Sequence, residues 1–304
     1  MKSLIFLFVP FLLFAQVEKF IINDSYVIDP YNHNRVTSES QGYGLLYAYV
    51  SNNEKLFENM WKWTKNHLRR KDALFSWNYN NAVVDKNNAT DGDLLIAYAL
   101  LKASQKWNRP DYKKEAEKII ASLKRLTLEI NGNYVLMPSE YGFVKDTGIF
   151  VYPSYYIPFV FEYLSENGDF LWKKMNTQRK SFDKISDKML FSFFDKKFFR
   201  LDTVSMDAYR LILYSYLNGE NVTEYKKIFT SVDLYFKKNG FIPIKYDYSK
   251  SFQTAQSSPY CVYMWFYMVY GDKNYLKKYT ELKKVDKNNY FCSFLDYFLE
   301  KGVK

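Results

Sequence analysis

Hydrophobic and polar positions along this chain predict two kinds of helix in alternation. Residues 45–49 and 94–103 are apolar around nearly the whole helical circumference, which is typical of helices buried on every side. Residues 53–68 and 109–126 carry apolar side chains on one stripe at helical spacing, with lysines elsewhere. The pattern therefore predicts that each buried helix is followed by a surface helix.

The number of predicted helix pairs decides the architecture. Six buried helices are expected, beginning near Gln41, Asp91, Ser154, Met206, Ser258 and Asn289. Six inner and five or six outer helices describe an all-α (α/α)6 barrel, with minor hairpin and loop insertions. Strand-length apolar runs do not alternate with helices as in a βαβ fold, and no fixed-period repeat indicates a solenoid. We expect a single barrel domain over residues 16–304.

Composition narrows the classes of partner. The chain has 304 residues, of which 48% are hydrophobic and 25% charged, values typical of a globular protein. Aromatic residues reach 20%, and Tyr and Trp offer the flat apolar face and polar group that suit a sugar ring. The net charge of +10 is spread over scattered lysine pairs, so we do not expect nucleic-acid binding.

The first residues predict export. A short basic start, an apolar run over residues 4–14 and the small residue Ala15 together resemble a signal peptide, residues 1–15. This run is too short to span a bilayer comfortably, and no later stretch is long and apolar enough, so no stable membrane insertion is expected. We expect a periplasmic protein, with the extracellular space as the alternative.

Cysteine and histidine are too scarce to indicate a metal or cofactor site. Cys261 and Cys292 lie in apolar helical runs, where an oxidising compartment would allow a bridge between them. Two buried free thiols are equally compatible with the pattern. Only His33 and His67 are present, and no phosphate-binding or dinucleotide motif occurs. We expect neither a metal nor a cofactor.

Three of the predicted inner helices begin with an acidic residue: Glu39, Asp91 or Asp207. The purely structural interpretation is a capping group or a charge placed favourably at a helix N-terminus. However, the N-terminus of a buried helix opens into the middle of the protein. Two carboxyl groups that meet in one groove are what glycoside hydrolysis requires. The pattern therefore favours a glycosidase.

A longer motif around Asp91 points to a family. Ala89-Thr90-Asp91-Gly92-Asp93, followed at fixed spacings by Ile96-Ala97, Ala99-Leu100-Leu101, Ala103 and Trp107, resembles the signature of glycoside hydrolase family 8. That family consists of inverting endoglucanases and their relatives. Ser38-Glu39, Gln41 and Tyr43-Gly44 are similar to another family segment. Asp207-Ala208-Tyr209-Arg210 resembles the subfamily that includes the cellulase accompanying bacterial cellulose synthase.

The resemblance implies roles for these residues. Glu39 is expected to be the general acid and Asp207 the general base, roughly 6.5–9.5 Å apart as in inverting enzymes. Asp91 is expected to position the sugar at the cleavage point. Substrate contacts are expected from Trp77, Tyr155, Arg210, Gln41 and Tyr43.

One position departs from the family pattern. Ser40 stands where the family has glycine. If that position required a positive φ angle, serine would be strained there.

The resulting functional hypothesis is an endo-β-1,4-glucanase, or cellulase, acting on cellulose or cello-oligosaccharides. We expect a monomer connected with the cellulose synthase machinery. One alternative is a hydrolase on the same barrel that acts on xylan, mixed-linkage glucan or chitosan. Another is a polysaccharide-binding assembly protein with little turnover. The presence of Glu39, Asp91 and Asp207 together favours an enzyme, because a binding protein needs no such set.

Overall fold

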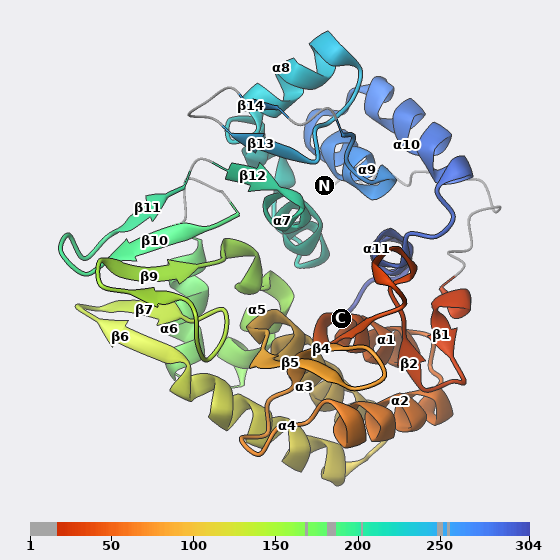
Figure 1. Cartoon of the computed structure of the whole chain (residues 1–304), viewed down its shortest axis with the longest axis vertical. Coiled ribbons are helices and arrows are strands. Elements are labelled where there is room, and N and C mark those ends of the chain that lie inside the picture. The colour runs from red at the N-terminus through yellow and green to blue at the C-terminus, as the bar shows by residue number, and fades with distance from the viewer. Residues whose placement is uncertain (1–16, 168–169, 181–186, 202, 248–251, 254–255) are drawn as a thin grey trace, which may run out of the picture.

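The computed structural model describes residues 17–304 except 168–169, 181–186, 202, 248–251 and 254–255. The expected signal peptide, residues 1–15, lies outside the described residues. Within them, helices form two concentric layers around one centre (Figure 1). The expected (α/α)6 barrel is thereby confirmed.

Six helices form the inner ring. Each contacts the next one in the ring, and the last contacts the first, which closes it (Figure 1). The ring consists of α1 (Ser38–Val50), α3 (Thr90–Lys106), α5 (Pro158–Glu166), α7 (Met206–Leu217), α9 (Tyr260–Tyr270) and α11 (Tyr290–Lys301).

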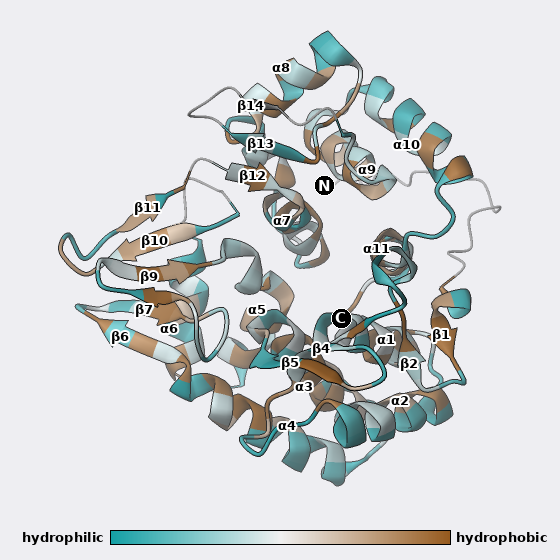
Figure 2. Ribbon diagram, viewed as in Figure 1, coloured by the Kyte–Doolittle hydropathy of each residue, from teal (hydrophilic) through white to brown (hydrophobic). Residues whose placement is uncertain are grey.

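The outer helices cover this ring with one apolar face each. Four of them pack on the inner helix that precedes them: α2 on α1, α4 on α3, α6 on α5 and α10 on α9. Figure 2 shows long hydrophilic stretches on α2, α4, α8 and α10, as expected for helices with one face in solvent. Their bounds are α2 (Glu54–His67), α4 (Pro110–Arg125), α6 (Phe170–Arg179), α8 (Thr230–Asn239) and α10 (Lys273–Val285).

Short antiparallel sheets lie between the helices. β3 (Val36–Thr37), β4 (Ser76–Tyr79) and β5 (Val83–Asn88) form one sheet, with Thr37 opposite Asn78. A second sheet has the order β11-β10-β9-β8, and a third has β12-β13-β14. The remaining bounds are β1 (Ile21–Ile22), β2 (Tyr26–Val27), β6 (Thr127–Ile130), β7 (Asn133–Leu136), β8 (Val144–Lys145), β9 (Gly148–Val151), β10 (Met189–Ser192), β11 (Phe198–Arg200), β12 (Thr203–Ser205), β13 (Lys245–Asp247) and β14 (Phe252–Gln253).

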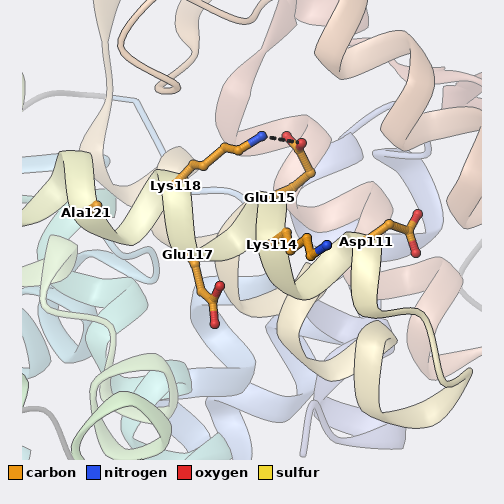
Figure 3. A pocket seen from close by; sticks show the side chains of 6 residues that line it. All are labelled: Asp111, Lys114, Glu115, Glu117, Lys118 and Ala121. Carbon is orange, nitrogen blue, oxygen red and sulfur yellow. Dashed lines mark hydrogen bonds and ion pairs between the residues drawn. The ribbon is translucent and has the colours of Figure 1, made fainter.

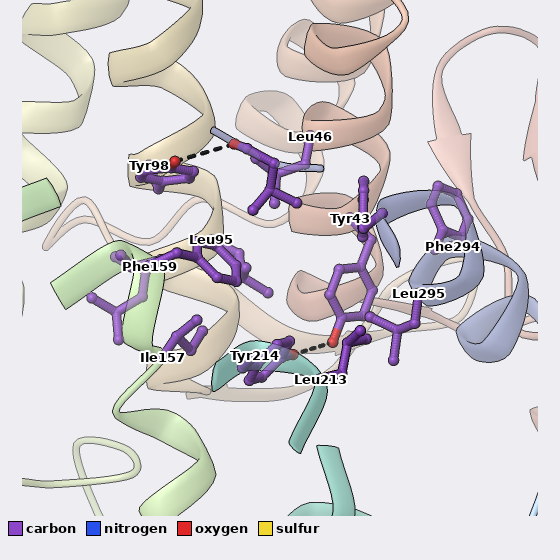
Figure 4. Close-up of a cluster of buried hydrophobic side chains, with 14 of the residues drawn as sticks. Tyr43, Leu46, Leu95, Tyr98, Ile157, Phe159, Leu213, Tyr214, Phe294 and Leu295 are labelled. Atoms are coloured by element: carbon purple, nitrogen blue, oxygen red, sulfur yellow. Dashed lines mark hydrogen bonds between the residues drawn. The ribbon is translucent and has the colours of Figure 1, made fainter. Parts of the chain in front are cut away.

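Large side chains fill the centre of the ring. Figure 4 shows Tyr43, Leu95, Phe159 and Tyr214 converging from α1, α3, α5 and α7, and all four are fully or almost fully buried. The hydroxyls of Tyr43 and Tyr214 hydrogen-bond to each other in this core. The centre is therefore a packed core, and the inner helices are held in fixed relative positions.

Close packing of α1 against α3 depends on two glycines. A Cβ atom on Gly92 would lie 2.8 Å from the backbone nitrogen of Glu39. A Cβ on Gly42 would lie 2.6 Å from the Cβ of Leu95. Both distances are shorter than real Cβ contacts allow, so these glycines let the first turns of the two helices approach.

Cys261 and Cys292 form a disulfide, which settles the alternative that the sequence left open. The bond joins the first turn of α9 to the first turn of α11, on adjacent inner helices. Among the described residues, none of the helices combines the length and apolar character needed to cross a membrane.

Candidate active site

Glu39, Asp91 and Asp207 meet around one guanidinium group. Each is the second residue of its inner helix: α1, α3 or α7. Arg210 of α7 contacts Glu39 Oε1 through Nη1. Its Nη2 lies 3.0 Å from Asp91 Oδ2 and 3.2 Å from Asp207 Oδ1. The structure thus brings together all three carboxylates that the sequence singled out.

The chain reaches these positions by the same local route each time. β3 leads directly into α1, β5 leads into α3 after Ala89, and β12 leads directly into α7. Each acidic side chain therefore lies in the first helical turn after a strand. The positive end of the helix dipole favours a carboxylate there.

Exposure differs sharply across the cluster. The side chain of Asp207 is 40% exposed and that of Glu39 is 19% exposed, whereas those of Asp91 and Arg210 are almost completely buried. Arg210 and Asp91 thus form the floor of the site, and Asp207 lies on its open side. A water molecule can approach Asp207 most easily.

Burial changes the protonation of the two inner acids. It raises the pKa of Glu39 to about 7, against the opposing attraction of Arg210 and with smaller contributions from Asp91 and Asp207 in the raising direction. Burial also raises the pKa of Asp91, again opposed by Arg210. A carboxyl group with a pKa near 7 can carry a proton at neutral pH and release it in a reaction.

Arg210 is itself held in place from several sides. Its Nη2 donates to Ser154 Oγ at 3.3 Å, and its guanidinium lies 5.5 Å from the ring centre of Tyr155. Ser154 and Tyr155 belong to a short 3₁₀ turn, Pro153–Tyr155, that precedes α5. Tyr155 also stacks on Tyr152 at 5.1 Å, so the structure places this predicted residue beside the acids.

Two predicted substrate contacts have other positions. The Gln41 amide donates to the carbonyl of Val27 at 3.3 Å and accepts from Thr64 at 3.4 Å, on the side of α1 that faces β2 and α2. Residues two apart on a helix do not share a face, so Gln41 points away from Glu39. The expectation that Gln41 contacts substrate is therefore wrong.

Tyr43 lies in the core on the buried side of Glu39 and not at the surface of the site. It follows Glu39 by four positions and so shares its helix face. Its hydroxyl donates to Glu39 Oε1 at 3.1 Å, and the residue is 1% exposed. Such deep burial rules out the expected contact between Tyr43 and substrate, and the hydroxyl supports Glu39 from below.

Trp77 lies on β4, beside the strand that leads into α1. Its indole nitrogen donates to Asp85 Oδ2 at 2.7 Å, and the guanidinium of Arg35 lies 5.6 Å from its ring centre. The side chain is partly exposed. Neither of these contacts joins Trp77 to the carboxylates, and its sugar-stacking role stays a prediction.

Ser40 and Asp91 have local arrangements that the sequence left open. Ser40 is helical, and it exchanges hydrogen bonds with Thr37 in a capping box, so serine causes no positive-φ strain here. At α3 the N-cap is Ala89 without a side-chain bond. Asp91 is therefore not the N-cap residue, but its carboxylate accepts the first-turn N–H of Gly92 and also contacts Arg210, so it serves both the helix start and the cluster.

Sequence reasoning missed Asp187. This buried residue precedes β10, and its Oδ1 accepts the N–H groups of Ser205 at 2.6 Å and Ala208 at 3.3 Å. Burial, followed by the charge of Asp207, raises the pKa of Asp187 to about 6. Asp187 belongs to none of the motifs, and only the tertiary structure brings it to α7.

Figure 3 shows a shallow hollow on the outer face of α4, crossed by the Glu115–Lys118 ion pair. It shares no residue with the site. Its lining of charged side chains on one outer helix is typical of a helix face in contact with solvent. In the part of the chain that the structure describes, no group of three or more acidic, histidine or cysteine residues is arranged for a metal ion. Within the carboxylate cluster, the positive charge comes from Arg210.

The comparisons with known proteins agree with this geometry. Residues 16–194, more than half of the chain, match the family described as Glycosyl hydrolases family 8. The chain belongs to this family. The matched part contains Glu39 and Asp91, whereas Asp207 and Arg210 lie beyond it and are brought to the site by the fold. The family 8 match and the carboxylate cluster are thus partly independent observations.

Relatives of this family 8 chain include an endoglucanase from Cellulomonas uda, 39% identical over 46% of this chain and 40% of that protein. A probable endoglucanase from Novacetimonas hansenii is 37% identical over 52% of this chain and 48% of that protein. The chain spans about half the length of the curated relatives it matches.

Solved structures match over nearly the whole chain. An endoglucanase from Komagataeibacter sucrofermentans has a TM-score of 0.80 at 25% identity, covering 94% of this chain and 96% of that one. An endo-beta-1,4-glucanase from Acetobacter xylinum has a TM-score of 0.79 at 24% identity, covering 95% and 97%. The family 8 fold therefore extends through the part of the chain that the family match does not reach.

Proposed function

We propose that this chain hydrolyses internal β-1,4-glucosidic bonds of a cellulose-like glucan with inversion. Glu39 is the general acid, Asp207 the general base, and Asp91 positions the sugar. The observation that carries the proposal is the convergence of these three carboxylates on Arg210. The endoglucanases among the relatives support the choice of a glucan substrate.

The proposed reaction assigns a proton to each group. Glu39, with its pKa raised to about 7, gives its proton to the departing glycosidic oxygen as the bond to the anomeric carbon breaks. A water molecule attacks that carbon from the opposite face and gives a proton to Asp207. The greater exposure of Asp207 suits a group that must hold a water molecule.

The other side chains of the site are proposed to bind and orient. Asp91 can accept hydrogen bonds from sugar hydroxyls, although part of its capacity is used by Arg210 and Gly92. Tyr155 and Trp77 present aromatic faces on which sugar rings can stack. Arg210 balances the negative charge of the cluster and fixes its shape.

The proposal is tested with Glu39→Gln, which keeps the size of the side chain but cannot donate the proton. We expect it to lose nearly all reducing-sugar release from carboxymethylcellulose while its circular dichroism spectrum stays that of the wild type. Glu58→Gln, on the exposed face of α2, is the matched control and should keep full activity. Near-normal turnover by Glu39→Gln would show that the acid is assigned wrongly.

The substrate and the non-catalytic alternative are separated by profiling. The wild type should release more reducing ends from cellulose derivatives than from xylan, lichenan or chitosan derivatives. A preference for one of the others would move the proposal to that polysaccharide on the same barrel. Binding without any release of reducing ends would favour the assembly-protein alternative.

We also propose export through residues 1–15 to the periplasm, as a monomer that works with the cellulose synthase machinery. The disulfide between Cys261 and Cys292 supports an oxidising compartment, because such bonds are rare in a reducing cytosol. Cell fractionation with thiol labelling tests this. Recovery of the protein in the cytoplasm with both thiols free would contradict it.

A further inference from the structure

The junction between β12 and α7 is held by a side chain from outside both elements. The Asp187 carboxylate accepts hydrogen bonds from the N–H groups of Ser205 and Ala208, which flank Asp207 in the sequence. The backbone N–H of Asp187 also donates to the carbonyl of Thr203 at 2.9 Å. Asp187 therefore holds the chain before and after the proposed general base.

This arrangement replaces a local cap. Ser205 is the N-cap residue of α7, but its side chain makes no capping hydrogen bond. By contrast, α1 is capped by Thr37 and α11 by Asn289, each from its own N-cap position. The unpaired N–H groups of a first helical turn need such an acceptor. At α7 the acceptor comes from residue 187.

We propose that Asp187 is a positioning residue that fixes the direction of the Asp207 side chain through the first turn of α7. The inference rests on the proposed role of Asp207 as general base. It deepens that role, because Asp187 acts on the backbone around Asp207 and does not itself reach the substrate. A misplacement of about 1 Å at a reacting group can cost a hundredfold in rate.

The surroundings of Asp187 make its contribution dependent on pH. Asp207 faces it from α7. Tyr152, in the segment after β9, is also near: burial raises the pKa of its hydroxyl, and the charges of Asp207 and Asp187 add to that rise. The neighbouring Lys188 lies over the rings of Phe150 and Tyr152. With its pKa raised to about 6, Asp187 is charged at pH 7 and largely protonated at pH 5. Protonation weakens it as an acceptor.

Two variants separate the acceptor from the charge. Asp187→Ala removes both, whereas Asp187→Asn keeps an oxygen that can accept from the same N–H groups. We expect Asp187→Ala to lower kcat on carboxymethylcellulose about 10- to 100-fold with little change in KM, because the base is misplaced while the substrate contacts remain. Asp187→Asn should lose less. In the wild type, kcat should fall as pH drops through about 6 and Asp187 becomes protonated; this fall should be absent from the pH profile of Asp187→Asn.

Asn53→Ala is the matched control, since Asn53 caps the outer helix α2 through the N–H of Leu56, away from the site. It should lower Tm without lowering kcat. The inference is overturned if both Asp187 variants keep wild-type kcat and pH profile while losing only Tm. If Asp187→Ala does not fold, the pH profile of Asp187→Asn decides. A wild type that hydrolyses no glucan would instead refute the proposed function, and this inference with it.

Discussion

A single arginine organises the chemistry of this site at the scale of residues. Arg210 is almost completely buried and contacts Glu39, Asp91 and Asp207. A buried guanidinium needs carboxylate partners, and carboxylates this close need a positive charge between them. Burial raises the pKa of Glu39, whereas the positive charge of Arg210 lowers it. The net result is a pKa of about 7.

This balance predicts the pH dependence of hydrolysis. Because Glu39 must be protonated to donate, kcat/KM should fall as pH rises through about 7, approaching a tenfold loss per further pH unit. The measurement is kcat/KM on a soluble cellulose derivative between pH 5 and 9, with circular dichroism at each pH as the control for folding. A value of kcat/KM that stays constant up to pH 9 would exclude Glu39 as the essential acid.

The sequence correctly predicted the site residues that lie in a motif at the start of an inner helix. It failed where a residue's role depends on the direction of its side chain or on a partner far away in the sequence. Glu39, Asp91 and Asp207 come together as expected. Gln41 belongs to the same motif, but two positions along the helix turn it toward α2. Asp187 has no local signal, because its partners belong to a helix that begins about twenty residues later.

At the scale of elements, the site depends on strands that end directly at inner helices and on the close approach of α1 to α3. Most inner helices begin within about three residues of their expected positions. The exception is α5, which starts at Pro158 because Pro153–Tyr155 forms a separate turn. The pairing of β9 with β10 could not be predicted, since α5 and α6 lie between these strands in the sequence.

Gly92 provides the test at this scale. In Gly92→Ala the new methyl group would press on Ser38 and on the backbone of Glu39, so the first turn of α1 must shift away from α3. Overpacking of this kind typically costs about 1–3 kcal/mol of folding free energy. We also expect kcat to fall by more than about tenfold, because the shift of α1 moves the carboxyl group of Glu39.

Gly44→Ala is the matched control for this change. Its methyl group would meet the side-chain ends of Val27 and Met60, on the other side of α1. Urea denaturation and kcat are measured for both variants. If both variants lose similar stability and the kcat of Gly92→Ala is equal to or higher than that of Gly44→Ala, the contact between α1 and α3 does not position Glu39.

At the scale of the whole molecule, the ring closes where α11 meets α1 on one side and α9 on the other. The disulfide between Cys261 and Cys292 joins two inner helices that carry none of the three acids. It therefore contributes to the stability of the ring and not to the chemistry. The closure of the ring follows from the alternating helix pattern, whereas the disulfide could not be inferred from two cysteines in apolar runs.

Reduction of this bond should lower Tm and leave the reaction intact. A cross-link between residues 31 positions apart stabilises by about 3–4 kcal/mol on the chain-entropy estimate. For a chain of this size that corresponds to a fall in Tm of roughly 5–10 °C. The double variant Cys261→Ala/Cys292→Ala should show the lower Tm with or without reductant and keep its kcat at 25 °C. A wild-type Tm unaffected by complete reduction would contradict this account.

The most direct test of the central claim is the stereochemistry of cleavage by the wild-type protein. Proton NMR spectra of a cello-oligosaccharide, recorded in the first minutes of hydrolysis, show which anomer forms before mutarotation. With Glu39 as acid and Asp207 activating water, the α-anomer must appear first at the new reducing end. First appearance of the β-anomer, or an oligosaccharide that remains uncut, would contradict the account.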